Sequence, residues 1–308
     1  MSVTFSGGGV TISGGGWTLS PPPGGNKAIF GYGDASAGGI VSMTNLVSNT
    51  GVVASDTTGV GTTRRGLAAA GYGTDKAIFG YGYTGASNTA ITNLVSNTGV
   101  VASDTTGVGT ARENPAAAGY GTDKAIFGYG YTTTNVSITN LVSNTGVVAN
   151  NTTGVGTARE SLAAAGYGTD KAIFGYGYST GTTSITNLVS NTGVVATDTT
   201  GVGTARYGLA AAGYGTDKAI FGYGTGPTTA VTNLVSNTGV VATDTTGVGT
   251  ARYGLSASGY GIGTAIFGYG STGTITSVTN LVSNTGVVAT DTTGVGTVRS
   301  NLAAAAYG

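Results

Sequence analysis

The chain has 308 residues, and its 12 Lys and Arg residues balance its 12 Asp and Glu residues. Charged residues make up 8% of the sequence, against about 25% in ordinary soluble domains, so we expect no electrostatic attraction to nucleic acid. The absence of Cys and His excludes a disulfide, a thiol nucleophile, a His-based catalytic triad and the usual zinc sites. We therefore expect no metal and no cofactor.

Residues 1–26 are a Gly- and Pro-rich arm that begins with three similar heptads, VTFSGGG, VTISGGG and WTLSPPP. The arm lacks the basic and apolar regions of a secretory signal, and no stretch of the chain reaches the roughly 18 apolar residues of a membrane span. One interpretation is a flexible leader. The other, which we favour, is an attachment segment that adds strands to another subunit's sheet, with Phe5 and Trp17 as buried anchors and residues 21–23 as a stiff spacer.

Residues 27–308 consist of six similar units of about 47 residues. Every unit contains the strings AIFGYG and NLVSNTGVVA, and then GVGT followed by one residue and Arg. Short runs rich in β-branched and aromatic residues alternate with Gly, Asn, Asp and Thr, and no segment has a helical period. About four strands per unit at this spacing is typical of a propeller blade.

The two ends of the repeat region complement each other. The first KAIFGYG, at residues 27–33, has no Ala-rich segment before it, and the last Ala-rich segment, at residues 302–308, has no KAIFGYG after it. Pairing these two segments would close a ring and remove exposed sheet edges. The sequence therefore predicts an all-β fold, a six-bladed β-propeller with four-stranded blades, in which the Ala-rich strands lie innermost and the N- and C-terminal strands close the ring.

The string RYGLAAAGYGTDKAIFGYG at residues 206–224 resembles the kelch repeat, in which an Arg and a small-residue strand precede a Gly-terminated strand. The resemblance covers residues 27–308, although Leu188 and Val195 stand where kelch units carry Tyr and Trp. It implies a propeller and no particular activity. The near-identical, Gly-rich copies and the string VTISGGGWT also resemble virion proteins of tailed bacteriophages, such as tail fibre, appendage and decoration proteins. That resemblance implies a virion protein, made in the host cytoplasm, whose partners are other virion proteins.

One Arg recurs in every unit and forms a predicted ring. A functional interpretation is a belt of guanidinium groups that binds a polyanion or an acidic sugar. We favour a structural one, in which each Arg links neighbouring blades through strand-end carbonyls or through the Asp eight residues upstream. Asn151 replaces that Asp in the third unit, so a carboxylate is not essential. The ring consists of Arg64, Arg112, Arg159, Arg206, Arg252 and Arg299.

Two places differ from unit to unit, the stretch after FGYG and the residue after the repeat Arg. In an antiparallel blade both places lie at the same end, so they are expected to share one face, opposite the TDK and SNTG turns. Loops on a rigid scaffold often carry recognition, and tyrosines there could stack on sugar rings or on another protein, although drift would also explain the variation. The predicted ligand-binding residues are Tyr83, Tyr131, Tyr178, Tyr207 and Tyr253.

No catalytic residue is predicted. One Asp in each DTTGVGT loop is too few for calcium, and the only Glu residues, Glu113 and Glu160, form no repeated acid–base pair. The sequence favours a non-enzymatic phage virion protein, anchored by its arm, that presents a propeller face to a host-surface glycan or a virion protein. The alternatives are a free lectin-like or protein-interaction propeller and, third, a glycan hydrolase.

Overall fold

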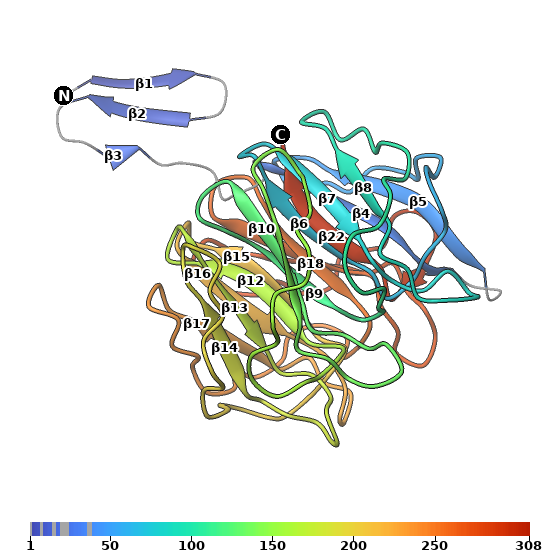
Figure 1. Ribbon diagram of the computed structural model, residues 1–308. Coiled ribbons are helices and arrows are strands. Elements are labelled where there is room, and N and C mark those ends of the chain that lie inside the picture. The colour runs from blue at the N-terminus through green and yellow to red at the C-terminus, as the bar shows by residue number, and fades with distance from the viewer. Residues whose placement is uncertain (1, 7–8, 14–16, 19–24, 36–38) are drawn as a thin grey trace.

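The computed structural model describes residues 2–6, 9–13, 17–18, 25–35 and 39–308 (Figure 1). Within these ranges the secondary structure consists of strands and turns, and no helix occurs. The all-β prediction is therefore confirmed. Every pair of strands in the described sheets is antiparallel.

Five units fold into the same three-stranded sheet, with the AIFG strand in the centre, between the Ala-rich strand and the TNLV strand. In the second unit Phe79 lies opposite Ala69 on one side and Asn93 on the other. The three strands of these sheets are β6 (Ala68–Tyr72), β7 (Lys76–Gly80) and β8 (Thr92–Val95); β9 (Ala116–Tyr120), β10 (Lys124–Gly128) and β11 (Thr139–Val142); β12 (Ala163–Tyr167), β13 (Lys171–Gly175) and β14 (Thr186–Val189); β15 (Ala210–Tyr214), β16 (Lys218–Gly222) and β17 (Thr232–Val235); β18 (Ser256–Tyr260), β19 (Thr264–Gly268) and β20 (Thr279–Val282).

The remaining sheet of the repeat region combines the two ends of that region. Strand β4 (Lys27–Ala35) pairs with β5 (Ile40–Val47) on one side and with β21 (Arg299–Ser300) and β22 (Ala303–Tyr307) on the other. Phe30 lies opposite Ala304 and Asn45, the same register as in the other sheets. The C-terminal strand thus supplies the Ala-rich strand that the first unit lacks, as the sequence predicts.

The predicted fourth strand is not a regular strand. Outside each TNLV strand the chain makes two isolated bridges, Val95 with Val101 and Thr92 with Thr105 in the second unit. Between these two bridges the Asp104 carboxylate accepts hydrogen bonds from Thr62 of the preceding unit. Side-chain bonds of this kind compete with a sheet ladder.

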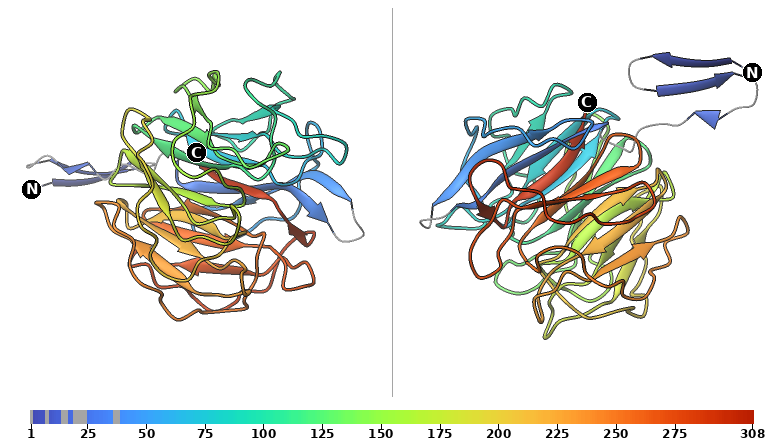
Figure 2. Two further views of the ribbon diagram at one scale, coloured as in Figure 1. Left: turned by 60° about the horizontal axis from the view of Figure 1, so that its bottom comes forward. Right: turned by 180° about the vertical axis from the view of Figure 1, so that it is seen from behind.

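The sheets follow one another around a common axis (Figure 2). Each Ala-rich strand packs against the next, in the order β6, β9, β12, β15, β18, β22 and back to β6. The small side chains of these strands line a narrow axial channel. The arrangement is compatible with a propeller-like repeat fold.

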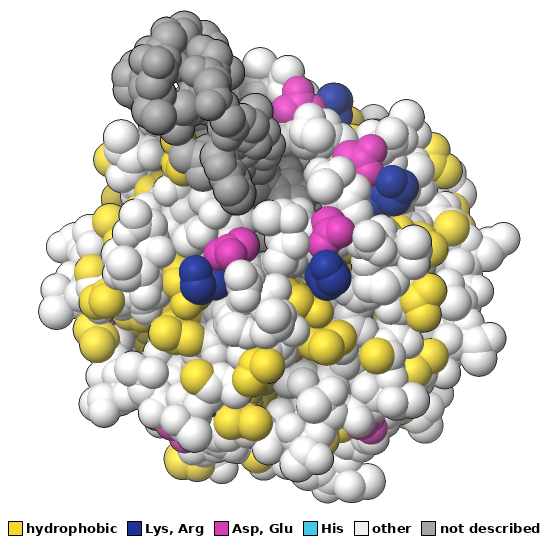
Figure 3. All heavy atoms as spheres, turned by 90° about the vertical axis from the view of Figure 1, so that its left-hand side faces the viewer, with side chains coloured by type: hydrophobic (Ala, Val, Ile, Leu, Met, Phe, Trp, Pro, Cys, Tyr) yellow, Lys and Arg dark blue, Asp and Glu magenta, His cyan; other side chains and the backbone are white. Residues whose placement is uncertain are grey.

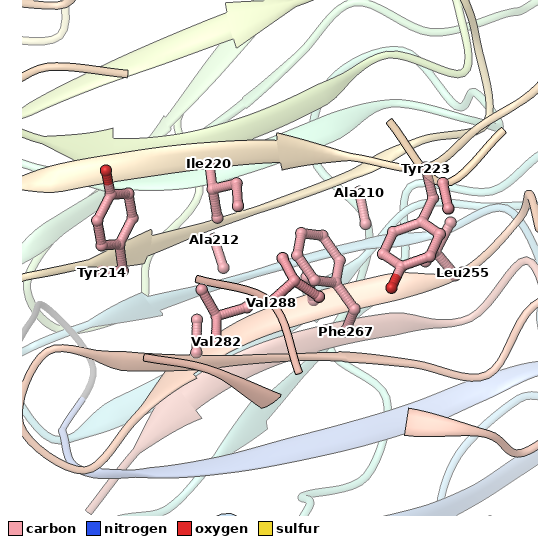
Figure 4. Packing of buried hydrophobic residues seen from close by; sticks show 12 residues of the cluster. Ala210, Ala212, Tyr214, Ile220, Tyr223, Leu255, Phe267, Val282 and Val288 are labelled. Atoms are coloured by element: carbon pink, nitrogen blue, oxygen red, sulfur yellow. The ribbon is translucent and has the colours of Figure 1, made fainter. Parts of the chain in front are cut away.

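Neighbouring sheets are joined by an aromatic residue that enters a space left by glycine. The Phe267 ring packs against Tyr223 of the preceding sheet, with 5.1 Å between ring centroids, and Figure 4 shows both rings in one apolar cluster with Ile220 and Val282. A Cβ atom on Gly222 would lie 2.7 Å from the Cζ atom of Phe267. The first Gly of FGYG is therefore required for the close approach of the next sheet.

Backbone hydrogen bonds close two circuits around the axis. In one, which we call the variable-end circuit, each N–H donates to the carbonyl of the preceding member, over 2.7–3.1 Å, and Gly66 closes the circuit by donating to Asn301. Its members all have φ between 51° and 60°, and they are Gly66, Asn114, Ser161, Gly208, Gly254 and Asn301. At the other channel end, the invariant-end circuit runs from the N–H of a glycine to a turn carbonyl of another sheet. Its donors are Gly73, Gly121, Gly168, Gly215, Gly261 and Gly308.

Candidate functional site

Each repeat arginine is fully buried between two sheets. Arg206 lies with its Cζ atom 4.3 Å from the ring centroid of Tyr176 in the preceding sheet. Its Nε donates to the carbonyl of Tyr223 at 2.7 Å, its Nη2 donates to Asn233 Oδ1 at 2.7 Å, and both acceptors belong to the following sheet. The six guanidinium groups are therefore inaccessible to a polyanion, and their contacts are those of a link between sheets.

The acceptors of the arginine are themselves held in place. Asn233 Nδ2 donates to the carbonyl of Ala242 at 3.0 Å and to Asp244 Oδ1 at 2.9 Å. Asp244 also accepts a hydrogen bond from the Thr204 hydroxyl at 2.6 Å, two residues before Arg206. The Arg, Asn, Asp and Thr side chains thus form a closed cluster.

The aspartate in this cluster is not the one that the sequence suggests. Asp198, eight residues upstream of Arg206, accepts hydrogen bonds from Thr157 of the preceding unit, and its Oδ1 lies 4.0 Å from Nη1 of Arg159. The upstream aspartate therefore takes part in the junction that contains the Arg of the preceding unit. Asn151 replaces it in the third unit and accepts from the Thr110 N–H at 3.1 Å.

Burial and hydrogen bonds fix the ionisation of these junction groups. Burial lowers the pKa of Arg206 and raises the pKa of Tyr176 to about 12. Burial also acts to raise the pKa of Asp244, but hydrogen bonds from Thr204 and Asn233 outweigh it and hold that pKa below its ordinary value. The hydrogen bonds that join Asp244 to Thr204 and Asn233 therefore favour its ionised form.

The structure joins one variable place of each unit to the other variable place of the next unit. The residue after the repeat Arg forms a bridge or strand pair with the residue after FGYG, beside the variable-end circuit. We call the surface formed by these six pairs the variable face. The pairs are Arg65 with Tyr83, Glu113 with Tyr131, Glu160 with Tyr178, Tyr207 with Thr225, Tyr253 with Ser271, and Ser300 with Asp34.

The predicted tyrosines do not form one continuous platform. Tyr178 is exposed, and its ring meets Tyr207 of the same unit edge to face, with 5.5 Å between centroids. Tyr83 lies under the Arg65 guanidinium, whose Cζ atom is 5.2 Å from the ring centroid. Tyr131 and Tyr253 are half-buried members of other bridges.

Charged residues occupy the other part of the variable face. Asp34 and Arg65 are not among the ligand-binding residues predicted from the sequence. Arg65 Nη1 lies 3.6 Å from Asp34 Oδ1, and Asn301 Nδ2 donates to Asp34 Oδ2 at 3.0 Å. Burial raises the pKa of Glu113; nearby Arg65 opposes the shift, and Glu160 adds to it. The sequence signal for the ion pair of Asp34 and Arg65 was the opposite charge of these two residues, which occupy the two variable places of the first unit.

The TDK and SNTG turns lie at the other end of the channel and form what we call the invariant face. Asp and Lys of each TDK turn form an ion pair, such as Asp170 with Lys171 at 2.8 Å, and Figure 3 shows these pairs on one face. Asn191 of an SNTG turn donates to Asp170 at 3.1 Å. The sixth unit has the sequence GIGT in place of GTDK, and its Ile262 is half exposed.

The arm joins the repeat region at the invariant face. Asn26 donates its N–H to the carbonyl of Gly308 at 2.9 Å and accepts a hydrogen bond from the N–H of Gly261 at 2.7 Å. Asn26 is thus a member of the invariant-end circuit. The chain therefore enters the repeat region at the end opposite the variable face.

Strands of the arm pair with one another. They are β1 (Ser2–Ser6), β2 (Gly9–Ser13) and β3 (Trp17–Thr18), and β2 lies between the other two. Phe5 pairs with Val10, and Trp17 pairs with Ile12. The predicted anchoring by the Phe5 and Trp17 side chains and the spacer at residues 21–23 lie outside what the structure describes.

The axial channel is too narrow for a sugar. The cavity toward its invariant end has a volume of about 100 Å³, whereas typical ligand pockets measure about 300–1,000 Å³. Among the residues that the structure describes, no cluster of three or more His, Cys, Asp or Glu could hold a metal ion. The same part of the chain has no helix that is long and apolar enough to cross a membrane.

Models of known protein families give no match to this chain. No curated protein is similar to it. The assignment of function therefore depends on the two faces and on the arm.

Proposed function

We propose that residues 27–308 form a six-bladed, kelch-like β-propeller in a non-enzymatic virion or appendage protein of a tailed phage. The arm attaches the protein to other virion proteins, and the variable face binds a host-surface glycan or a neighbouring virion protein. The observation that carries the proposal is that Asn26, where the arm ends, lies at the channel end opposite the variable face. Attachment through the arm leaves the variable face pointing outward.

The propeller assignment is supported by the closure of the repeat region. Each hydrogen-bond circuit includes one member from every sheet, and the Ala-rich strands pack in a closed order. The two outer bridges of each unit stand where a fourth strand of a blade would lie. A ring of this kind is a rigid base for loops that recognise a ligand.

The binding role is supported by the chemistry of the variable face. It combines the edge-to-face pair of Tyr178 and Tyr207 with the side chains of Asp34, Arg65 and Asn301 in the opposite sector. Aromatic rings supply apolar faces, and polar groups supply hydrogen bonds, which is the mixture that sugar recognition needs. The side chains of the junction clusters are already engaged in contacts between sheets.

The first test is binding of the full chain to candidate host cells and to immobilised glycans. We expect saturable binding that is lost when Tyr83, Tyr178 and Tyr207 are all replaced by Ser. The matched control is Val194→Ser, directly after the SNTG turn of the invariant face, which removes a side chain that is 66% exposed. Undiminished binding by the triple variant, or equal loss in the control, would contradict recognition by this face.

A second test separates a virion protein from a free lectin. Phage particles are grown with the Phe5→Ser and Trp17→Ser double variant, and the amount of the protein in purified particles is measured. We expect incorporation to fall while binding of the isolated variant to glycans or cells is unchanged. Normal incorporation would favour the free lectin, and release of reducing sugar that depends on Glu113 and Glu160 would favour the hydrolase.

A further inference from the structure

We infer that the variable face contains one preferred saccharide site, a groove beside Asp34 and Arg65, and that it takes a neutral hexose unit of a glycan. This inference rests on the proposed glycan binding and names the site and the class of sugar. We call it the side groove. Its lining includes Asp34, Arg65, Tyr83, Ile40, Thr274 and Ile275, which come from three neighbouring sheets.

The side groove lies where the variable places of three neighbouring sheets meet. In the first unit β4 and β5 pair as antiparallel strands, with Asp34 opposite Ile40 (Figure 1). In the neighbouring sheets Tyr83 forms a bridge with Asn88, and Ser271 forms a bridge with Ile275. The residue after FGYG from each of these three sheets therefore lines the groove.

Two charged groups at the groove retain hydrogen-bonding capacity. The 3.6 Å between Arg65 Nη1 and Asp34 Oδ1 is too long for a good hydrogen bond, so each group keeps unused donors or lone pairs. The Arg65 side chain is 41% exposed and the Asp34 side chain 20%. Asn301 holds the other oxygen of the carboxylate, which fixes its orientation.

These groups fit a vicinal diol. One hydroxyl of the diol donates to Asp34 Oδ1, and its neighbour accepts a hydrogen bond from the Arg65 guanidinium. Charge-assisted bonds of this kind are stronger than bonds between neutral groups. The groove pairs one cation with one anion, so a neutral sugar satisfies both, whereas a carboxylated sugar is repelled by Asp34.

The rest of the groove suits the body of a pyranose ring. Ile40 and Ile275 lie on the lining with Tyr83, and they offer apolar surface to the C–H face of a sugar. Thr274 adds a hydroxyl at the same groove. The open volume is about 700 Å³, within the range of small-molecule sites, so the groove has room for more than one sugar unit.

The experiment is calorimetric titration of the full chain with neutral oligosaccharides of glucose, galactose or mannose, and with uronic-acid oligosaccharides of matched length. Asp34→Asn and Tyr83→Ser are the test variants, and Val194→Ser, which changes an exposed side chain on the invariant face, is the control. We expect at least one neutral series to bind. Each test variant should weaken that binding by about tenfold or more, and the control by less than about twofold.

The outcomes separate this inference from the proposed function. Cell binding that is lost in the triple variant of Tyr83, Tyr178 and Tyr207 but kept in the Asp34→Asn and Tyr83→Ser single variants overturns the side groove and leaves the proposed function standing. Binding of uronic-acid probes alone overturns the neutral class. Absence of any binding to cells and sugars by the folded wild-type chain overturns both. Thermal unfolding of each variant checks that lost binding is not lost folding.

Discussion

Arg64 and Arg65 are neighbours in the chain, yet they belong to regions that use side chains in different ways. Arg64 is fully buried at a junction between sheets, over Tyr32, and it donates to Asn93. Arg65 is partly exposed on the variable face and pairs loosely with Asp34. At the junctions the side chains themselves join the sheets, so the same residues are needed in every unit.

At the variable face the sheets are joined by backbone instead. The variable-end circuit is made of N–H and C=O groups, and its members include Gly, Asn and Ser. Because the backbone makes the connection, the adjoining side chains can differ between units without opening the ring. This explains how a nearly uniform repeat carries a face whose residue pairs differ, with only the Glu–Tyr pair occurring twice.

The largest expected effect comes from removing a junction arginine. Arg206→Met leaves Asn233 and two backbone carbonyls without a buried donor, and we expect a loss of about 3 kcal/mol or more in the free energy of unfolding. Arg65→Met, on the variable face, should change it by less than about 1 kcal/mol. Urea unfolding measures both. Similar losses in the two variants would remove the distinction between the regions.

Replacing a glycine at a junction should lower the stability of the protein nearly as much as removing a junction arginine. Gly175→Ala places a Cβ atom 2.7 Å from Phe221 Cζ, and overpacking of this kind costs about 1–3 kcal/mol. A Cβ atom on Gly181, in the variable loop of the same unit, meets nothing within 4 Å, so Gly181→Ala should change stability by less than about 0.5 kcal/mol. Thermal unfolding of the pair is the measurement. A tolerated Gly175→Ala would show that the junction can relax.

The junction aspartates should give a smaller, pH-dependent effect. The folded-state pKa of Asp244 is depressed, so its ionised form adds stability above the unfolded pKa near 4, and that stability is lost as pH falls through the folded pKa. Asp244→Asn copies the residue found at Asn151. Because the carboxylate is largely exposed, we expect a loss of up to about 1 kcal/mol at pH 7 and almost none at pH 2. A difference that does not change with pH would contradict the ionic part of this contact.

Sequence patterns were sufficient to predict the strands and the closure of the ring, but they could not predict the contacts between units. Short runs of β-branched and aromatic residues bounded by Gly, Asn, Asp and Thr indicate the strands, and the missing halves at the two ends indicate their pairing. Six near-identical copies cannot show whether Asp198 contacts its own unit or the preceding one. The axial circuits consist of backbone bonds, which leave no side-chain pattern beyond the small residues that accept a positive φ.

Part of the candidate site could also be predicted. The position of the variable places within a blade was enough to expect them on one face, and the bridges join them there. The side groove could not be expected, because its lining comes from three neighbouring sheets and brings together residues far apart in the sequence, such as Asp34, Arg65 and Ile275.

The smallest expected effect has the opposite sign to that of the junction aspartates. Burial raises the folded-state pKa of Glu113 on the variable face, so its charged form costs stability above that pKa, and the cost disappears as pH falls below the unfolded value. Glu113→Gln should therefore raise the free energy of unfolding by about 0.3 kcal/mol at pH 7, discounted for exposure, and by nothing at pH 3. Paired urea titrations at the two pH values resolve the change. A gain in stability for Glu113→Gln beside a loss for Asp244→Asn would show that the junction carboxylates stabilise the fold, whereas the Glu113 carboxylate is tolerated at a small cost. That is the result expected for a surface on which function decides the residue. A loss of stability for Glu113→Gln would instead group Glu113 with the junction carboxylates.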